Sequence, residues 1–170
     1  VESPSSRGDG VLHALKLDWM RFTTQQYRDY VRLEAEPLRR YTPDIPITHN
    51  LMSTYPGINY FELARDLDVV SWDNYPLWRD EGDDWVAADT AFRHDLHRGL
   101  GGGRPFLLME SSPSATNWQP VAKLRRPGVH QLTSLQAVAH GSDSVQYFQF
   151  RKGRGGYEKF HGAVVDHYAT

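Results

Sequence analysis

Apolar segments of strand length alternate with amphipathic segments of helix length along this sequence, and that alternation limits the folds available to the chain. A helix is expected over residues 23–41, and four strand–helix pairs follow it. The expected strands lie within 44–51, 68–72, 106–109 and 144–150. Strands that alternate with helices make right-handed crossovers and a parallel sheet. The fold class is therefore α/β, as an open sheet or as half of a (β/α)8 barrel.

The polar residues that end each strand favour the barrel. In barrels, the active site is built from the carboxyl ends of the strands. Here every expected strand ends in side chains capable of chemistry: His49 with Asn50, Asp73 with Asn74 and Tyr75, Glu110 with Ser111, and Gln149 with Arg151.

The helix expectations are specific enough to be checked. The first helix has a capping-box spacing at Thr23 and Gln26, and Pro37 is expected to bend it or to end it early. Residues 1–17 are expected to form a loop, and the spacing of apolar residues predicts a last helix over 157–168. His94 and His97 are expected on a solvated helix face.

Composition narrows the classes of partner. The 170 residues suffice for one domain, and the net charge of −2 gives no reason to expect nucleic acid or an anionic membrane as partner. No apolar run has the length of a membrane span. The absence of cysteine fits a cytoplasmic protein. The start at Val1 and the loop-like first ten residues predict a piece of a longer protein.

Glu110 is the sharpest candidate for a catalytic residue. It directly follows the four apolar residues 106–109, so it is expected at the mouth of the core. The alternative is a strand-end acid that caps a neighbouring loop. Trp118 lies eight residues later, and its ring either lines a ligand pocket or folds back over the core.

Glu158 and His161 form the second candidate pair. If the segment is helical, a spacing of three puts both on one face, where they can hydrogen-bond one small polar ligand. A surface ion pair is the alternative. A metal would need a third protein ligand, and none is evident, so neither a metal nor a cofactor is expected.

Three longer stretches together carry a family resemblance. "SWDNYP", "FLLMESSPSATNWQP" and "YFQFRKGRGGYEKFHGAVV" resemble the bacterial β-galactosidases of glycoside hydrolase family 42, and the resemblance covers nearly the whole chain. It implies the second half of a (β/α)8 barrel and a retaining mechanism with two carboxylates. It also implies that residues 1–170 are part of a single catalytic domain.

The resemblance assigns a role to each candidate residue. Glu110 matches the catalytic nucleophile, which follows the seventh strand of the barrel, and Trp118 matches the tryptophan beside the galactosyl unit. Glu158 and His161 match the sugar-binding glutamate and histidine after the eighth strand, and Tyr75 matches an active-site tyrosine after the sixth.

One part of the family pattern is missing. The general acid/base glutamate of the family follows an asparagine, and no Asn-Glu pair occurs in this chain. We therefore expect a fragment that needs the remaining half of the barrel, from an enzyme that cleaves terminal β-D-galactosides and forms homo-oligomers. A retaining glycosidase with another sugar specificity and a non-catalytic sugar-binding half-barrel are the alternatives.

Overall fold

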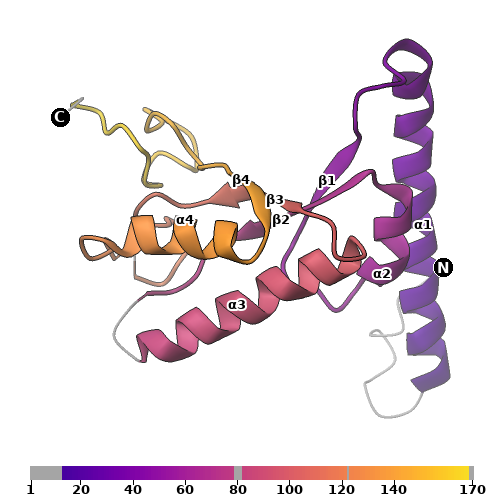
Figure 1. The fold of residues 1–170 in the computed structure, drawn as a ribbon, viewed down its shortest axis with the longest axis horizontal. Helices are drawn as coiled ribbons and strands as arrows, with labels where there is room; N and C mark the ends of the chain where they lie inside the picture. The colour runs from indigo at the N-terminus through magenta and orange to yellow at the C-terminus, as the bar shows by residue number, and fades with distance from the viewer. Residues whose placement is uncertain (1–12, 79–81, 122, 169–170) are drawn as a thin grey trace. The chain divides into compact units, whose positions relative to one another are not determined.

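The computed structural model describes residues 13–78, 82–121 and 123–168 (Figure 1). The chain divides into two compact units: residues up to 48 together with 54–69, and residues 49–53 together with 70 onward. No helix in the described ranges is long and apolar enough to cross a membrane.

The first unit is dominated by the helix α1 (His13–Tyr41), which is longer than the sequence predicted. It begins ten residues before Thr23, so residues 13–17 are helical and not loop, and it continues through Pro37 to Tyr41. The short helices α2 (Tyr60–Leu63) and η2 (Ala64–Asp66) follow. Asn59 caps α2, because its side chain accepts a hydrogen bond from the Phe61 amide.

The second unit contains the sheet, in the order β1-β2-β3-β4. Its strands are β1 (Thr48–Leu51), β2 (Val69–Asn74), β3 (Phe106–Ser111) and β4 (Ser142–Val145). The pairs β2–β3 and β3–β4 are parallel, which confirms the parallel α/β prediction. β3 runs two residues further than expected and includes Glu110, whereas β4 ends before the aromatic residues at 147 and 148.

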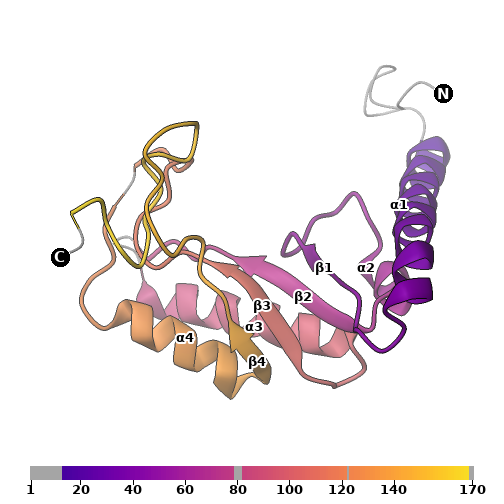
Figure 2. The ribbon, with the colours of Figure 1, turned by 90° about the horizontal axis from the view of Figure 1, so that it is seen from above.

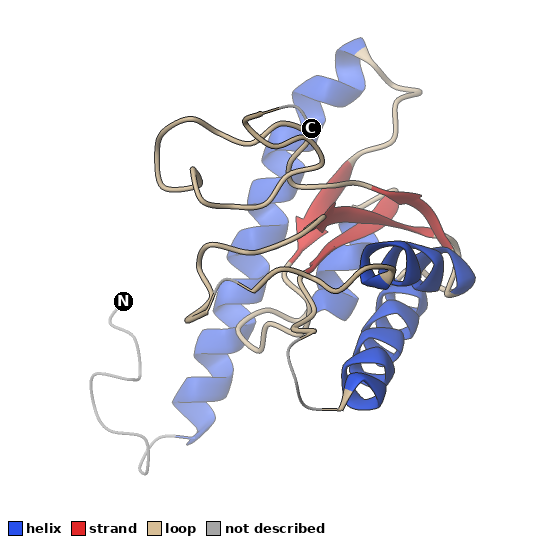
Figure 3. Cartoon of the chain, turned by 90° about the vertical axis from the view of Figure 1, so that its left-hand side faces the viewer, coloured by secondary structure: helices blue, strands red, loops and turns tan. Residues whose placement is uncertain are grey.

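The helices α3 (Asp83–Leu100) and α4 (Val129–Ala139) cover one face of this sheet (Figure 2). Long loops follow the carboxyl ends of β3 and β4 (Figure 3). The expected last helix is absent from the described residues, because 157–160 form turns and residues 162–168 are irregular.

The core between β2, β3 and α3 overturns the prediction for His94 and His97. Both imidazoles are fully buried. The His97 ring stacks on Trp72 with centroids 4.3 Å apart, and the His94 ring stacks on Phe106 at 5.5 Å. The buried face of α3 therefore follows the spacing of Thr90, His94 and His97, whereas the more apolar Phe92 is exposed. Flat aromatic partners on the sheet explain why imidazole rings fit this interface.

Candidate active site

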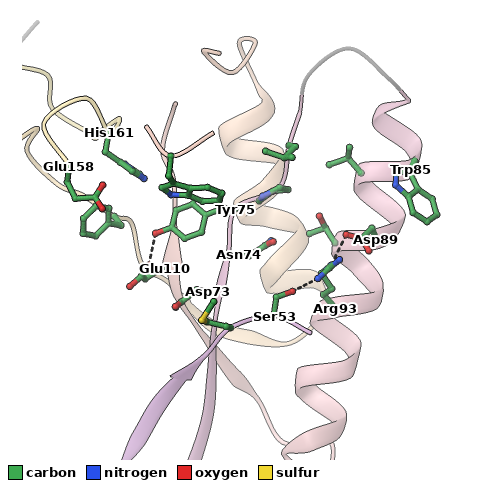
Figure 4. A pocket seen from close by; sticks show the side chains of 17 residues that line it. Ser53, Asp73, Asn74, Tyr75, Trp85, Asp89, Arg93, Glu110, Glu158 and His161 are labelled. Atoms are coloured by element: carbon green, nitrogen blue, oxygen red, sulfur yellow. Dashed lines mark hydrogen bonds and ion pairs between the residues drawn. The ribbon is translucent and has the colours of Figure 1, made fainter. Parts of the chain in front are cut away.

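A cavity of about 1110 Å³ opens at the carboxyl ends of β2 and β3 (Figure 4). All five residues singled out from the sequence line it: Tyr75, Glu110, Trp118, Glu158 and His161. The fold therefore brings together side chains that are up to 86 positions apart in the sequence, from Tyr75 to His161.

A β-bulge sets the direction of Glu110. The β2–β3 pairing runs Ser71 to Leu107 and Trp72 to Leu108, then shifts so that Asp73 faces Glu110 and Met109 is left over. Side chains alternate between the faces of a strand, so without the shift Glu110 would share the helix-covered face with Leu108. The bulge turns Glu110 to the other face, beside Asp73, and both line the cavity.

The Tyr75 hydroxyl holds the Glu110 carboxylate. Tyr75 Oη donates to Glu110 Oε2 at 2.6 Å. Burial, together with this hydrogen bond, raises the pKa of the Tyr75 hydroxyl far above its ordinary value. Tyr75 therefore stays protonated and remains a donor. A hydrogen bond donated to a carboxylate stabilises its ionised form, so the contact suits an anionic Glu110.

Asp73 is a second partly buried carboxyl group in the cavity. Asn50 Nδ2 on β1 donates to Asp73 Oδ2 at 2.7 Å. Burial, and the neighbouring Glu110 charge to a smaller degree, raise the pKa of Asp73 to about 6, although the Asn50 hydrogen bond opposes the shift. Asp73 therefore changes its charge within the neutral range.

Aromatic rings form one wall of the cavity. The Tyr75 ring lies edge-on to Trp118, with centroids 5.5 Å apart, and edge-on to His161 at 5.9 Å. Phe148 meets His161 in the same way at 4.9 Å. Trp118 is more than half exposed, so its ring is not folded back over the core. An exposed indole face beside a carboxylate is suited to stacking against a sugar ring.

His161 and Glu158 reach the cavity from a turn rather than from a helix. The His161 amide donates to the Glu158 carbonyl at 2.9 Å, which closes a tight turn. The predicted helical face was therefore wrong, although a turn of this spacing also brings both side chains to the cavity (Figure 4). Glu158 has no ion-pair partner among the residues the structure describes, so the surface ion-pair alternative is not supported.

The hydrogen bonds of His161 define its chemistry. Its Nδ1 lies 3.0 Å from the Gly162 carbonyl oxygen, which can only accept, so Nδ1 carries the proton. Nε2 is then an acceptor, and it is buried without a hydrogen-bond partner among the described residues. This side chain can accept a hydroxyl hydrogen from a ligand in the cavity.

Two loops are tied together beneath this wall. The Gly162 amide donates to the Ala115 carbonyl at 2.7 Å, and Asn117 Nδ2 donates to the Tyr157 carbonyl at 2.6 Å. A side chain at 162 would place its Cβ 1.9 Å from Ser114 Oγ, so only glycine permits this approach. The contact fixes the Trp118 loop against the turn that carries Glu158 and His161.

Part of the cavity was not predicted. Ser53 and three residues of α3 (Trp85, Asp89 and Arg93) line its far side. Arg93 Nε donates to Asp89 at 2.7 Å, and the Arg93 guanidinium also bonds the Ser53 hydroxyl. The Asp-Arg spacing of four indicates a helical ion pair but carries no information that its face borders a cavity.

Replacing Tyr75 with phenylalanine in the full-length enzyme should lower kcat by about tenfold to a hundredfold, because Glu110 loses the hydrogen bond from the Tyr75 hydroxyl and the orientation that it gives. KM should change much less. Steady-state kinetics on a nitrophenyl glycoside would measure both. Tyr157→Phe is the matched control, since Tyr157 is almost fully exposed. Equal losses in the two variants would contradict the role of the hydroxyl.

The comparisons with known proteins agree on one family. A family model described as beta-galactosidase, glycoside hydrolase family 42, matches residues 1–170. The chain is 60% identical over 98% of its length to the β-galactosidase Pbg of Clostridium perfringens, and 58% identical over 98% to BglY of Alicyclobacillus acidocaldarius. It covers 25% and 24% of these two relatives.

Solved structures give the same result. The cold-adapted β-galactosidase from Rahnella sp. R3 superposes with a TM-score of 0.95 at 54% identity, over 99% of this chain and 25% of that one. A GH42 β-galactosidase, Gan42B from G. stearothermophilus, superposes at 0.93 with 48% identity, in the form of a catalytic mutant, over 100% of this chain and 26% of that one. The chain thus spans about a quarter of the length of the proteins it matches. The alternation of parallel strands and helices is explained by this relationship: the chain belongs to glycoside hydrolase family 42, the β-galactosidase family, and forms part of its (β/α)8 barrel.

Proposed function

We propose that this chain is the segment of a retaining β-galactosidase that carries the nucleophile, Glu110, and one wall of the galactose site. The observation that carries the proposal is the geometry of Glu110. Its carboxylate stands at the end of β3, faces the cavity and accepts a hydrogen bond of 2.6 Å from Tyr75. A nucleophile has to be ionised and fixed in position, and this contact serves both needs.

The reaction would proceed in two displacements. A Glu110 oxygen forms a bond to the anomeric carbon while the bond from that carbon to the leaving oxygen breaks, and a protonated acid gives its hydrogen to the leaving oxygen. Water then attacks the glycosyl–enzyme ester from the other face. The ester bond breaks, Glu110 leaves as a carboxylate, and the acid group regains its proton from the water. The anomeric configuration is retained.

The acid/base group of this scheme lies outside these 170 residues. Retaining enzymes place their two carboxyl groups about 5–5.5 Å apart, on opposite sides of the sugar. Asp73 is the neighbour of Glu110 on the same face of the sheet, so it cannot approach from the opposite side. Glu158 is better suited to binding, because it lies beside His161. We therefore expect no galactosidase activity from the 170-residue chain alone.

The four strands are proposed to be the fifth to eighth strands of the barrel. The family resemblance places the nucleophile after the seventh strand, and Glu110 ends the third strand of this sheet. β1 and β4 are the outer strands of the sheet. Large apolar side chains of α1, such as Leu33 and Tyr41, are exposed in this chain and would be covered by the remaining barrel.

A substrate panel with the full-length enzyme tests the function. We expect hydrolysis of 4-nitrophenyl β-D-galactoside well above that of the β-glucoside, β-mannoside and α-galactoside. Proton NMR of the first product should show the β-anomer before mutarotation, as retention requires. Faster hydrolysis of one of the other three glycosides would identify a different sugar specificity. If none of the four glycosides is hydrolysed, a non-catalytic sugar-binding protein is favoured.

Glu158 and His161 are proposed to hold hydroxyl groups of the galactosyl ring. Glu158→Ala or His161→Ala in the full-length enzyme should lower kcat/KM for the galactoside by about tenfold to a hundredfold, because a hydrogen bond to a buried or charged partner is worth about 1.5–3 kcal/mol. Lys159→Ala is the control, since Lys159 lies in the same turn and its ammonium group faces the exposed Phe160 ring. Unchanged kinetics in both test variants would exclude the two residues from the site.

A further inference from the structure

Asp73 has a place in this site that the two-carboxylate mechanism does not explain. It pairs with Glu110 across β2 and β3, and both side chains lie on the same face because of the bulge at Met109. Neighbouring strands are about 4.8 Å apart. The carboxyl groups of Asp73 and Glu110 therefore lie at paired positions of neighbouring strands, at the floor of the cavity (Figure 4).

Each of the two carboxyl groups has its own donor, and the donors lie on different sides. Asp73 Oδ2 accepts from Asn50 Nδ2 at 2.7 Å, on the β1 side. Glu110 Oε2 accepts from Tyr75 Oη at 2.6 Å. The other oxygen of Asp73, Oδ1, is buried and has no hydrogen-bond partner among the described residues. The strand β2 thus supplies the Asp73 carboxyl group, and Tyr75, the residue directly after β2, supplies the hydroxyl that holds Glu110.

The electrostatic surroundings of Asp73 are simple. From β3 it faces the Glu110 carboxylate, from β1 it faces the neutral Asn50, and Tyr75, directly after β2, is also neutral. Within the described part of the chain, no lysine, arginine or histidine forms an ion pair with it. Burial and the Glu110 charge raise the pKa of Asp73, so the interaction between the two carboxyl groups is repulsive when both are ionised.

We propose that Asp73 is a positioning residue for Glu110: its carboxylate, anchored by Asn50, repels the Glu110 carboxylate and keeps it turned toward the Tyr75 hydroxyl and the bound sugar. The role rests on the proposed function, in which Glu110 is the nucleophile. The variant Asp73→Asn should therefore affect the chemical step more than binding.

The coupling can be measured without any substrate. Infrared difference spectra of the full-length enzyme between pH 5 and pH 8, with [4-13C]aspartate to identify the band, should show one aspartic acid that loses its proton near pH 6. The band should be absent in Asp73→Asn and present in the control Asp143→Asn, which removes an exposed aspartate from β4. In Glu110→Gln the midpoint should move to lower pH, because the repelling charge is gone. A midpoint that does not move in Glu110→Gln would overturn the proposal.

Kinetics provide the second measurement. Above pH 6, Asp73→Asn should lower kcat by about tenfold with KM changed by less than about twofold, and the loss should shrink below pH 6, where the wild-type Asp73 is also neutral. A double-mutant cycle with Tyr75→Phe should be non-additive, because both residues act on the same carboxylate. A loss that is uniform across pH, or a fully additive cycle, would show a merely structural role.

The outcomes separate the two proposals. If the wild-type enzyme hydrolyses no β-galactoside but the infrared midpoint moves in Glu110→Gln, the proposed function fails and the coupling of the two carboxyl groups stands. If the enzyme is active and the midpoint does not move, the role of Asp73 fails and the nucleophile assignment stands. The Glu110→Gln measurement leaves Asp73 unchanged, so it remains decisive even if Asp73→Asn does not fold.

Discussion

Glu110→Ala in the full-length enzyme will lower turnover of 4-nitrophenyl β-D-galactoside by about 10⁴-fold or more, a loss of the size seen when a covalent nucleophile is removed. Alanine leaves no group that can bond to the anomeric carbon, and it leaves the Tyr75 hydroxyl without its acceptor. The variant should still bind galactose, because Trp118 and His161 are untouched. Stopped and continuous nitrophenol assays would measure the loss.

Azide distinguishes a missing nucleophile from a damaged site. A small anion can enter the space that the Glu110 carboxylate vacates and attack the anomeric carbon from the same side, while the nitrophenolate leaves. The product should be α-galactosyl azide, with one inversion. Glu36→Ala is the control, since it removes an exposed glutamate from α1 that forms a surface ion pair with Arg40. Full activity of Glu110→Ala without azide would refute the nucleophile assignment.

Acid should destabilise the protein strongly through His94 and His97. Burial lowers the pKa of His94 to about 3 and that of His97 to about 4, from an unfolded value of 6.5. Below pH 6.5 the unfolded chain therefore binds protons that the folded chain does not, so stability falls as the pH falls. At pH 5 each histidine costs about 2 kcal/mol relative to pH 7, at about 1.4 kcal/mol per pH unit. The loss continues until the folded pKa values are reached.

Urea unfolding of the full-length enzyme at pH 7 and pH 5 would measure this effect. His94→Phe should reduce the pH dependence by about 2 kcal/mol, because both ring nitrogens of His94 lack hydrogen-bond partners in the described chain and phenylalanine keeps the aromatic packing on Phe106. His13→Phe, at an exposed position of α1, is the control. The raised pKa of Asp73 has the opposite effect, because it favours the folded state in acid. This contribution is present in the wild type and in His94→Phe alike, so it does not affect the difference between them. An unchanged pH dependence in His94→Phe would show that His94 does not titrate in this way.

The site residues that could be predicted from the sequence are the polar side chains at the carboxyl ends of the strands. Glu110 comes directly after an apolar segment, Tyr75 comes three residues after Trp72, and parallel strands bring their carboxyl ends together. The bulge was not predictable, because the uninterrupted apolar run 106–109 carries no signal of a register shift. It decides nonetheless that Glu110 faces the cavity rather than α3.

Helix faces and helix ends were predicted less well. His94 was predicted to face solvent, and the aromatic partners Trp72 and Phe106 that explain its burial lie on other elements. Pro37 was expected to bend or end α1, yet the helix continues beyond it. The pairing of Glu158 with His161 was correct in space although the helix was not, because a turn and a helix both join residues three apart.

The contact at Gly162 makes the Trp118 loop and the His161 turn a single structural unit. The loop with Trp118 and the turn with His161 are more than 40 positions apart, yet neither can change its path without displacing the other. Exchanging one of these loops with that of a relative would bring a foreign backbone against Ala115 or Gly162 and displace Trp118 or His161. Specificity in this family should therefore be transplanted by moving both segments together, and recombination points are best placed outside residues 112–162.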